Sequence, residues 1–72
     1  MRPKPSRPKE VERLAYRLGF VFERQNGGHR VYRRADGRSV AIAFHPGDIP
    51  RMTLKKIIRE LEISVEQFNE MV

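Results

Sequence analysis

The sequence predicts an α+β fold with the order α-β-β-β-α-α, in which helices cover one face of a three-stranded antiparallel sheet. Two segments, one near the start and one in the last third, carry apolar residues at the helical spacing i, i+3, i+4, i+7. Between them lie three short stretches rich in strand-forming residues, separated by glycine-containing turns. Because two amphipathic helices need an apolar surface to cover, both are expected on one sheet face, with the other face open and basic.

The length and composition limit what the chain can be. It has 72 residues, no cysteine, 39% hydrophobic residues and a net charge of +6. A chain this short buries only about 60% of its unfolded surface, which argues against a second domain or a large enclosed active site. The absence of cysteine excludes disulfides and thiolate chemistry, and it fits a reducing compartment such as the cytoplasm.

Residues 1–8 are expected to form a flexible basic arm, and residues 9–72 a single domain. Three prolines alternate with basic residues in the arm, and Pro8 suits the first position of a helix. The helix that follows presents one apolar face and is expected to end at Gly19. Its second stripe is basic and consists of Lys9, Arg13 and Arg17.

Three strands are expected at residues 20–24, 29–34 and 39–44. The turns between them are short, so the strands should form an antiparallel meander. Further along, Thr53 is the expected N-cap of the second amphipathic helix, and Ser64 with Gln67 forms a capping box for a short final helix. The α-β-β-β-α part of this order is also that of double-stranded-RNA-binding domains.

The positive charge is concentrated in the first two thirds of the chain. Residues 1–51 carry 12 Lys and Arg against five Asp and Glu, whereas residues 52–72 carry three against four. Eleven of the basic residues are Arg, whose planar side chain binds phosphate and stacks on exposed bases. A membrane surface is the competing polyanion, but the longest apolar run covers only residues 40–44 and Trp is absent. RNA is therefore the expected partner, and membrane binding is not expected.

Few residues in the chain can carry chemistry. The acidic residues lack metal-ligand spacing and the glycines do not form a phosphate-binding loop, so neither a metal nor a cofactor is expected. Of the two histidines, His29 directly follows Gly27 and Gly28. An imidazole there can take the proton from an RNA 2′-hydroxyl, while neighbouring Arg side chains neutralise the phosphate and the glycines allow a close approach. The plain alternative is a surface histidine at a strand end.

Strand alternation leaves the orientation of this histidine open. It places His29 on the same side as Val31, whereas Arg30, Tyr32 and Arg34 point the other way. If Val31 faces the core, His29 does not lie on the open face unless a bulge or its strand-end position reorients it.

His45 is expected at the same end of the sheet as His29. Antiparallel pairing brings the start of the second strand beside the end of the third, where His45 precedes Pro46. His45 is then an acid partner to His29, a phosphate contact, or a residue that fixes the loop.

Several short segments occur together in a familiar order: Leu18-Gly19-Phe20, Gly27-Gly28-His29-Arg30-Val31-Tyr32, Asp36-Gly37-Arg38, His45-Pro46-Gly47, Thr53-Leu54-Lys55-Lys56-Ile57 and Ser64 to Phe68. Through them the chain resembles the HicA toxin family of bacterial toxin–antitoxin systems, from about Lys9 to Phe68. Two positions depart from the family pattern: Gly28 stands where Ser is usual, and Met52 where Gly usually precedes Thr-Leu.

The resemblance implies an mRNA interferase with a double-stranded-RNA-binding-domain-like fold. It implies that His29 is the catalytic histidine, that cleavage needs no metal, and that a HicB-type antitoxin inhibits the toxin by covering the active site. The missing serine hydroxyl at Gly28 removes a contact to phosphate or to the histidine.

Two functions therefore compete. The first is a toxin that cleaves mRNA through His29, and the second is a non-catalytic module that binds RNA or the ribosome. A DNA-binding operator module is weaker, because no helix combines a basic face with a helix-turn-helix partner. The residues expected to contact RNA are Lys9, Arg13, Arg17, Gly28, Arg30, Tyr32, Arg34 and His45.

Overall fold

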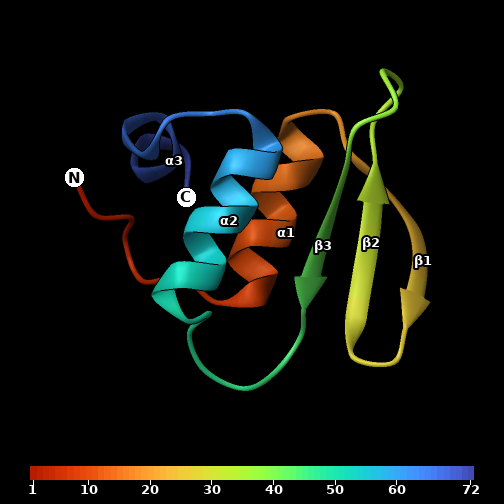
Figure 1. The fold of residues 1–72 in the computed structure, drawn as a ribbon, viewed down its shortest axis with the longest axis horizontal. Helices are drawn as coiled ribbons and strands as arrows, with labels where there is room; N and C mark the ends of the chain where they lie inside the picture. Colours follow the sequence, from red (N-terminus) through yellow and green to blue (C-terminus); the bar gives the residue numbers. More distant parts are fainter.

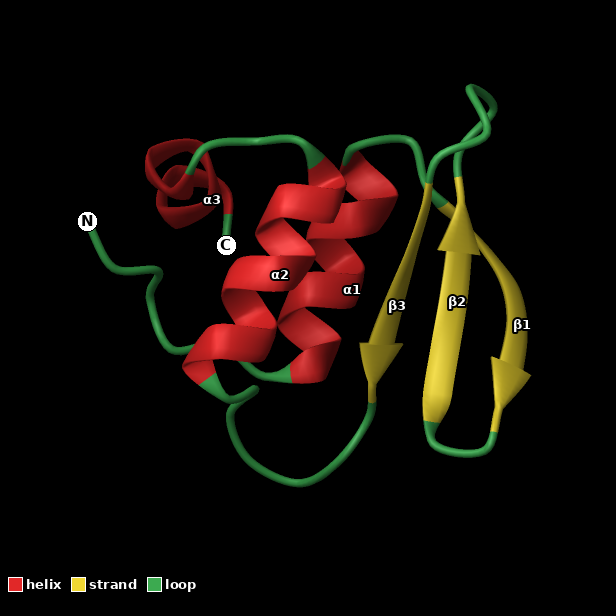
Figure 2. Cartoon of the chain, in the orientation of Figure 1, coloured by secondary structure: helices red, strands yellow, loops and turns green.

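The computed structural model describes residues 1–72 and confirms the expected order of elements (Figure 1). The elements are α1 (Pro8–Arg17), β1 (Val21–Asn26), β2 (His29–Arg33), β3 (Ser39–Ala43), α2 (Arg51–Leu61) and α3 (Val65–Met71). Figure 2 shows the helices gathered beside β3, with β1 at the far edge of the molecule. No helix is long and apolar enough to span a membrane.

The sheet is an antiparallel meander with the strand order β1-β2-β3, as the short turns predict. The register between β2 and β3 is regular and pairs His29 with Ala43 at one end. The register between β1 and β2 shifts between Phe22 and Arg24, so Glu23 forms a bulge. Side-chain alternation is therefore uninterrupted along β2, which allows the facing of each β2 residue to be read from its neighbours.

Tyr32 decides which face of β2 is inward. Its side chain is 0% exposed, and its hydroxyl donates a hydrogen bond to the carboxylate of Glu12 on α1. Tyr16 donates to the same carboxylate oxygen at 3.4 Å, and Arg30 does so at 3.2 Å. Tyr32 is thus a core residue, which corrects its expected role as an RNA contact, because a side chain packed between sheet and helix has no surface to offer.

The core lies between this face of the sheet and the helices. Tyr32 shares it with Val40 and Ile42 of β3, whereas Ala41 between them is exposed. The 13 buried hydrophobic residues form one cluster: Val11, Leu14, Ala15, Phe20, Tyr32, Val40, Ile42, Ile49, Leu54, Ile57, Ile58, Leu61 and Phe68. The opposite face of the sheet is uncovered.

Two of the three expected helix ends are confirmed, and the expected N-cap of α2 is wrong. Gly19, at φ +92°, ends α1 as expected, and Ser64 accepts from the Gln67 backbone at 3.0 Å in a capping box. Thr53 is not an N-cap. Helix α2 begins two residues earlier, because the Pro50 carbonyl already accepts from the Leu54 N–H at 2.8 Å.

The N-terminal residues lie against the rest of the molecule in this structure. Ser6 is 1% exposed, and its carbonyl accepts from the Ile49 N–H at 2.8 Å. The Lys4 N–H donates to the Asn69 side chain at 2.8 Å, and that amide donates to the Arg2 carbonyl at 3.1 Å. These contacts join the two ends of the chain. The flexibility of residues 1–8 in solution stays a prediction.

Tyr32→Phe tests whether the hydroxyl bound to Glu12 holds the sheet to α1. Loss of this hydrogen bond to a charged group is expected to lower the free energy of unfolding by about 1–3 kcal/mol. Tyr16→Phe is the matched control, because Tyr16 is 46% exposed and its bond is long. Urea denaturation measures the free energy of unfolding of both variants. Equal losses in the two would contradict a larger contribution of the Tyr32 hydroxyl to stability.

The same contact predicts a loss of stability in alkali. Burial, the hydrogen bond to Glu12 and its negative charge all raise the pKa of Tyr32. Because the folded-state pKa is raised, this stabilisation is complete below the ordinary tyrosine pKa of about 10 and is lost as the pH rises above it. Tyr32→Phe should lose less stability than the wild type between neutral and strongly alkaline pH.

Candidate nucleic-acid interface

One end of the sheet collects the β1–β2 turn, the end of β3 and the start of α1 (Figure 1). The Phe44 N–H donates to the Gly28 carbonyl at 2.8 Å, which extends the pairing of β2 and β3 by one residue. His29 lies directly beyond Gly28, and His45 lies directly beyond Phe44. The prediction that both histidines lie at the same end of the sheet is therefore confirmed.

His29 lies on the open face. It is three residues before the inward-facing Tyr32, so regular alternation turns it outward together with Val31. Its cross-strand neighbours are Asn26 and Ala43. The side chain is exposed and makes no hydrogen bond or ion pair within the protein. A free imidazole at a strand end is suited to exchange protons with a bound ligand.

The open face itself is less basic than expected. Its two arginines, Arg24 and Arg33, both pair with Glu23. Hydrogen bonding to Arg33, together with both positive charges, lowers the pKa of Glu23. The β3 residues of this face are Ser39, Ala41 and Ala43, which are small and uncharged. The middle of the sheet therefore lacks unpaired cations, which corrects the expectation of a basic sheet platform.

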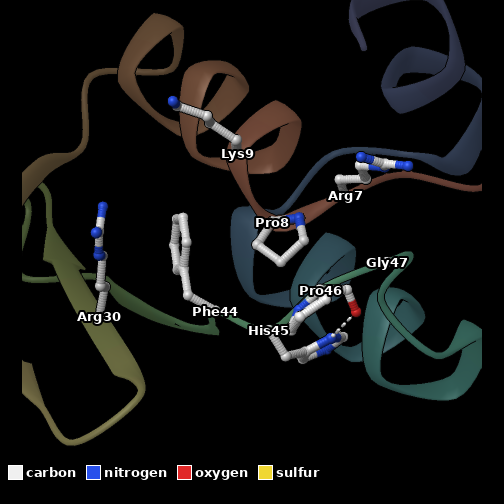
Figure 3. A pocket seen from close by; sticks show the side chains of 8 residues that line it. All are labelled: Arg7, Pro8, Lys9, Arg30, Phe44, His45, Pro46 and Gly47. Atoms are coloured by element: carbon white, nitrogen blue, oxygen red, sulfur yellow. Dashed lines mark hydrogen bonds between the residues drawn. The ribbon is translucent and has the colours of Figure 1, made fainter.

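A basic pocket lies on the other side of the same sheet end, between the sheet and the start of α1 (Figure 3). Its volume is about 430 Å³. The lining residues are Arg7, Pro8, Lys9, Arg30, Phe44, His45, Pro46 and Gly47. Four of these eight side chains are Arg, Lys or His, and none is acidic.

Arg30 forms one wall of this pocket. Its guanidinium lies 4.1 Å from the centre of the Phe44 ring and also pairs with Glu12 at 3.2 Å. His45 is exposed and its Nδ1 lies 3.0 Å from the Pro46 carbonyl, a contact that fixes the local loop. Arg30 and His45, both expected RNA contacts, thus lie at the pocket.

Arg34 is not brought to this end. It lies at the opposite end of β2, where it pairs with Asp36 at 2.9 Å and donates to the Leu18 carbonyl at 3.2 Å. Its guanidinium also lies 4.8 Å from the centre of the Phe20 ring. Hydrogen bonding to Arg34 lowers the pKa of Asp36. Through these contacts Arg34 connects the β2–β3 hairpin to the end of α1, at the opposite end of the sheet from His29.

The basic stripe of α1 divides between two places. Lys9 lines the basic pocket, whereas Arg17 donates to the Met71 carbonyl at 3.1 Å and so contacts the C-terminal helix. Arg13 lies beside Arg17 in a small hollow against the end of the chain. A stripe at spacing i+4 winds around a helix, so its members face different neighbours.

Two pocket residues were not expected from the sequence. Arg7 was assigned to the flexible arm, although it directly precedes the first residue of α1. Phe44 was counted only as the last residue of a strand. Its position two residues beyond the buried Ile42 places it on the inward face, at the point where that face reaches the sheet end.

No group of three His, Cys, Asp or Glu side chains lies close enough to hold a metal ion.

Comparison with known protein families identifies the family to which the chain belongs. Residues 8–63 match the family described as HicA toxin of bacterial toxin–antitoxin, which is well over half of the chain. The chain belongs to the HicA toxin family. It is a toxin of a toxin–antitoxin system, which implies a cognate antitoxin as partner. No curated protein matches the chain. The matched region runs from α1 to just beyond α2, so it contains His29 and all pocket residues of the toxin except Arg7.

The two glycines before His29 predict different responses to substitution. Gly27 has φ +63°, so Gly27→Ala should lower the free energy of unfolding by about 1–2 kcal/mol. A Cβ at Gly28 would meet nothing nearer than the Phe44 carbonyl oxygen at 3.7 Å, an ordinary contact. Gly28→Ala and Gly28→Ser should each change the free energy of unfolding by less than about 0.5 kcal/mol. Urea denaturation distinguishes the two positions, and a larger loss at Gly28 would contradict this geometry.

Proposed function

We propose that this toxin is an endoribonuclease that cleaves mRNA, with His29 as its catalytic acid/base. One observation carries the proposal: an exposed histidine without a protein partner lies at a sheet end whose other side is a basic pocket. Membership of the HicA toxin family supports it, since the match over residues 8–63 includes His29, the residue that the resemblance of the Gly27–Tyr32 segment implies as catalytic.

The proposed reaction uses the 2′-hydroxyl of RNA as the nucleophile. The imidazole of His29 accepts the 2′-hydroxyl proton, the 2′ oxygen attacks the adjacent phosphorus, and the bond from phosphorus to the 5′ oxygen breaks. The leaving 5′ oxygen takes a proton from water, which reaches this exposed strand end. Because the nucleophile belongs to the substrate, the protein supplies only a base, an orientation and positive charge.

The positive charge is expected to come from the edge of the sheet and not from its open face. Arg30 points away from His29 along β2 and lies in the basic pocket with Lys9. Arg30 is paired with Glu12, and the arginines of the open face are paired with Glu23. The unpaired charge that attracts the RNA backbone to this end therefore comes from Lys9.

We further propose that the cognate antitoxin is of the HicB type and that it inhibits by covering the sheet end around His29. That surface projects beyond the helices (Figure 1), so a partner can cover it without disturbing the core. The purified complex should leave RNA intact, and release of the antitoxin should restore cleavage.

His29→Ala is the direct test of the catalytic role. Removal of a general base is expected to lower the cleavage rate about 10²- to 10⁴-fold, measured with a labelled mRNA fragment and purified protein. Circular dichroism should show an unchanged fold, since the side chain is exposed and makes no contact that holds the sheet. Expression of the variant should no longer arrest growth.

Lys56→Ala, an exposed change on α2, is the matched control and should cleave like the wild type. A folded His29→Ala variant that cleaves at the wild-type rate would refute the proposal. A wild-type protein that binds RNA and leaves it intact would instead favour the non-catalytic RNA-binding module.

A further inference from the structure

We propose that the basic pocket holds one nucleotide of single-stranded RNA, next to the bond presented to His29. Arg7, Lys9 and His45 would contact its phosphate, and the ring of Phe44 would contact its base. The position of the nucleotide beside the cleaved bond rests on the proposed function. The proposed binding of RNA in the pocket does not depend on cleavage by His29.

Apart from Arg30, which pairs with Glu12, the basic side chains of this pocket form no ion pair, unlike most others near the sheet. Arg24, Arg33, Arg34 and Arg38 all pair with carboxylates. In contrast, Arg7, Lys9 and His45 are exposed and form no ion pair. Two unpaired cations, Arg7 and Lys9, at a concave surface whose lining contains no carboxylate are suited to a phosphate group, and an imidazole N–H can add a hydrogen bond.

Phe44 adds a surface for a base. One face of its ring is covered by the Arg30 guanidinium at 4.1 Å, and the other face turns toward Pro8 across the pocket (Figure 3). Glu12 holds Arg30 from the far side at 3.2 Å, so the arginine fixes the ring. The pocket volume of about 430 Å³ is large enough for a nucleotide.

The glycines connect this pocket with His29. The pocket and His29 lie on opposite sides of the sheet, and a strand that reaches both has to cross the sheet end. At Gly27 an added Cβ would meet nothing within 4 Å, and at Gly28 it would meet only the Phe44 carbonyl oxygen at 3.7 Å. The two glycines therefore leave room at this edge, where the Gln25 side chain donates to the Gly27 carbonyl at 3.0 Å. Single-stranded RNA is flexible enough to follow this bend, whereas a rigid duplex is not.

The test measures binding of a fluorescent single-stranded RNA octamer to the non-cleaving His29→Ala toxin by anisotropy. Added Arg7→Ala or Lys9→Ala should each weaken binding about fivefold or more and lower the slope of log K against log salt by about 0.7. Added Lys56→Ala is the matched control for loss of one positive charge and should change the affinity less than twofold.

Phe44→Leu separates base contact from phosphate contact. It should weaken binding of the RNA octamer about fivefold or more. It should leave binding of an abasic ribose-phosphate octamer unchanged, whereas Arg7→Ala and Lys9→Ala should weaken both probes. Circular dichroism checks that each variant is folded.

Two results would overturn the inference: pocket variants that bind RNA as tightly as the control, or Phe44→Leu affecting both probes equally. Failure of the cleavage proposal has a different signature. A wild-type toxin that leaves RNA intact, with binding still sensitive to Arg7, Lys9 and Phe44, would remove the catalytic role and support the pocket.

Discussion

The burial of Tyr32 is the constraint on which the rest of the structure depends. Its hydroxyl meets the Glu12 carboxylate between the sheet and α1, and this single contact fixes which side of β2 faces the helices. Alternation then determines the neighbours on the strand. Arg30 turns inward to the edge of the core, and His29 turns outward to the open face.

The two proposed functions of the sheet end follow from this arrangement. His29, the proposed base, lies on one side of the edge, and the basic pocket proposed to bind RNA lies on the other. The turn between them contains Gly27 and Gly28, which add no side chain of their own to this edge. Had Val31 faced the helices, His29 would have entered the core side and Arg30 the open face. The facing of β2 thus determines on which side of the sheet His29 and Arg30 lie.

Much of this arrangement can be predicted from the sequence, because the positions of helices, turns and helix ends depend on residues close together in the chain. The order of elements, the end of α1 at Gly19 and the capping box at Ser64 follow from spacing, glycine conformation and capping. The common end of His29 and His45 follows from antiparallel pairing. Thr53 fails as a cap because Pro50, three residues earlier, is the N-cap of the same helix.

The facing of β2 could not be predicted, because residues 29–34 place an apolar or aromatic residue on each side. Val31 and Tyr32 are both strand formers, and contacts distant in sequence accompany the inward facing of Tyr32: the hydrogen bond to Glu12 and the pairing with the buried Val40. Arg34 looked like a phosphate contact because it is near His29 in sequence, yet a strand carries it to the opposite end. Arg7 and Phe44 were missed because the pocket joins residues from three separate segments.

The most direct measurement is an NMR titration of isotopically labelled His29→Ala toxin with a single-stranded RNA octamer. The account predicts that the largest amide shifts fall on residues 7–9, 27–30 and 44–47, on both sides of the glycine edge. Shifts centred on α3, or on the middle of the open face around Ala41 with none at residues 7–9 and 44–47, would contradict it.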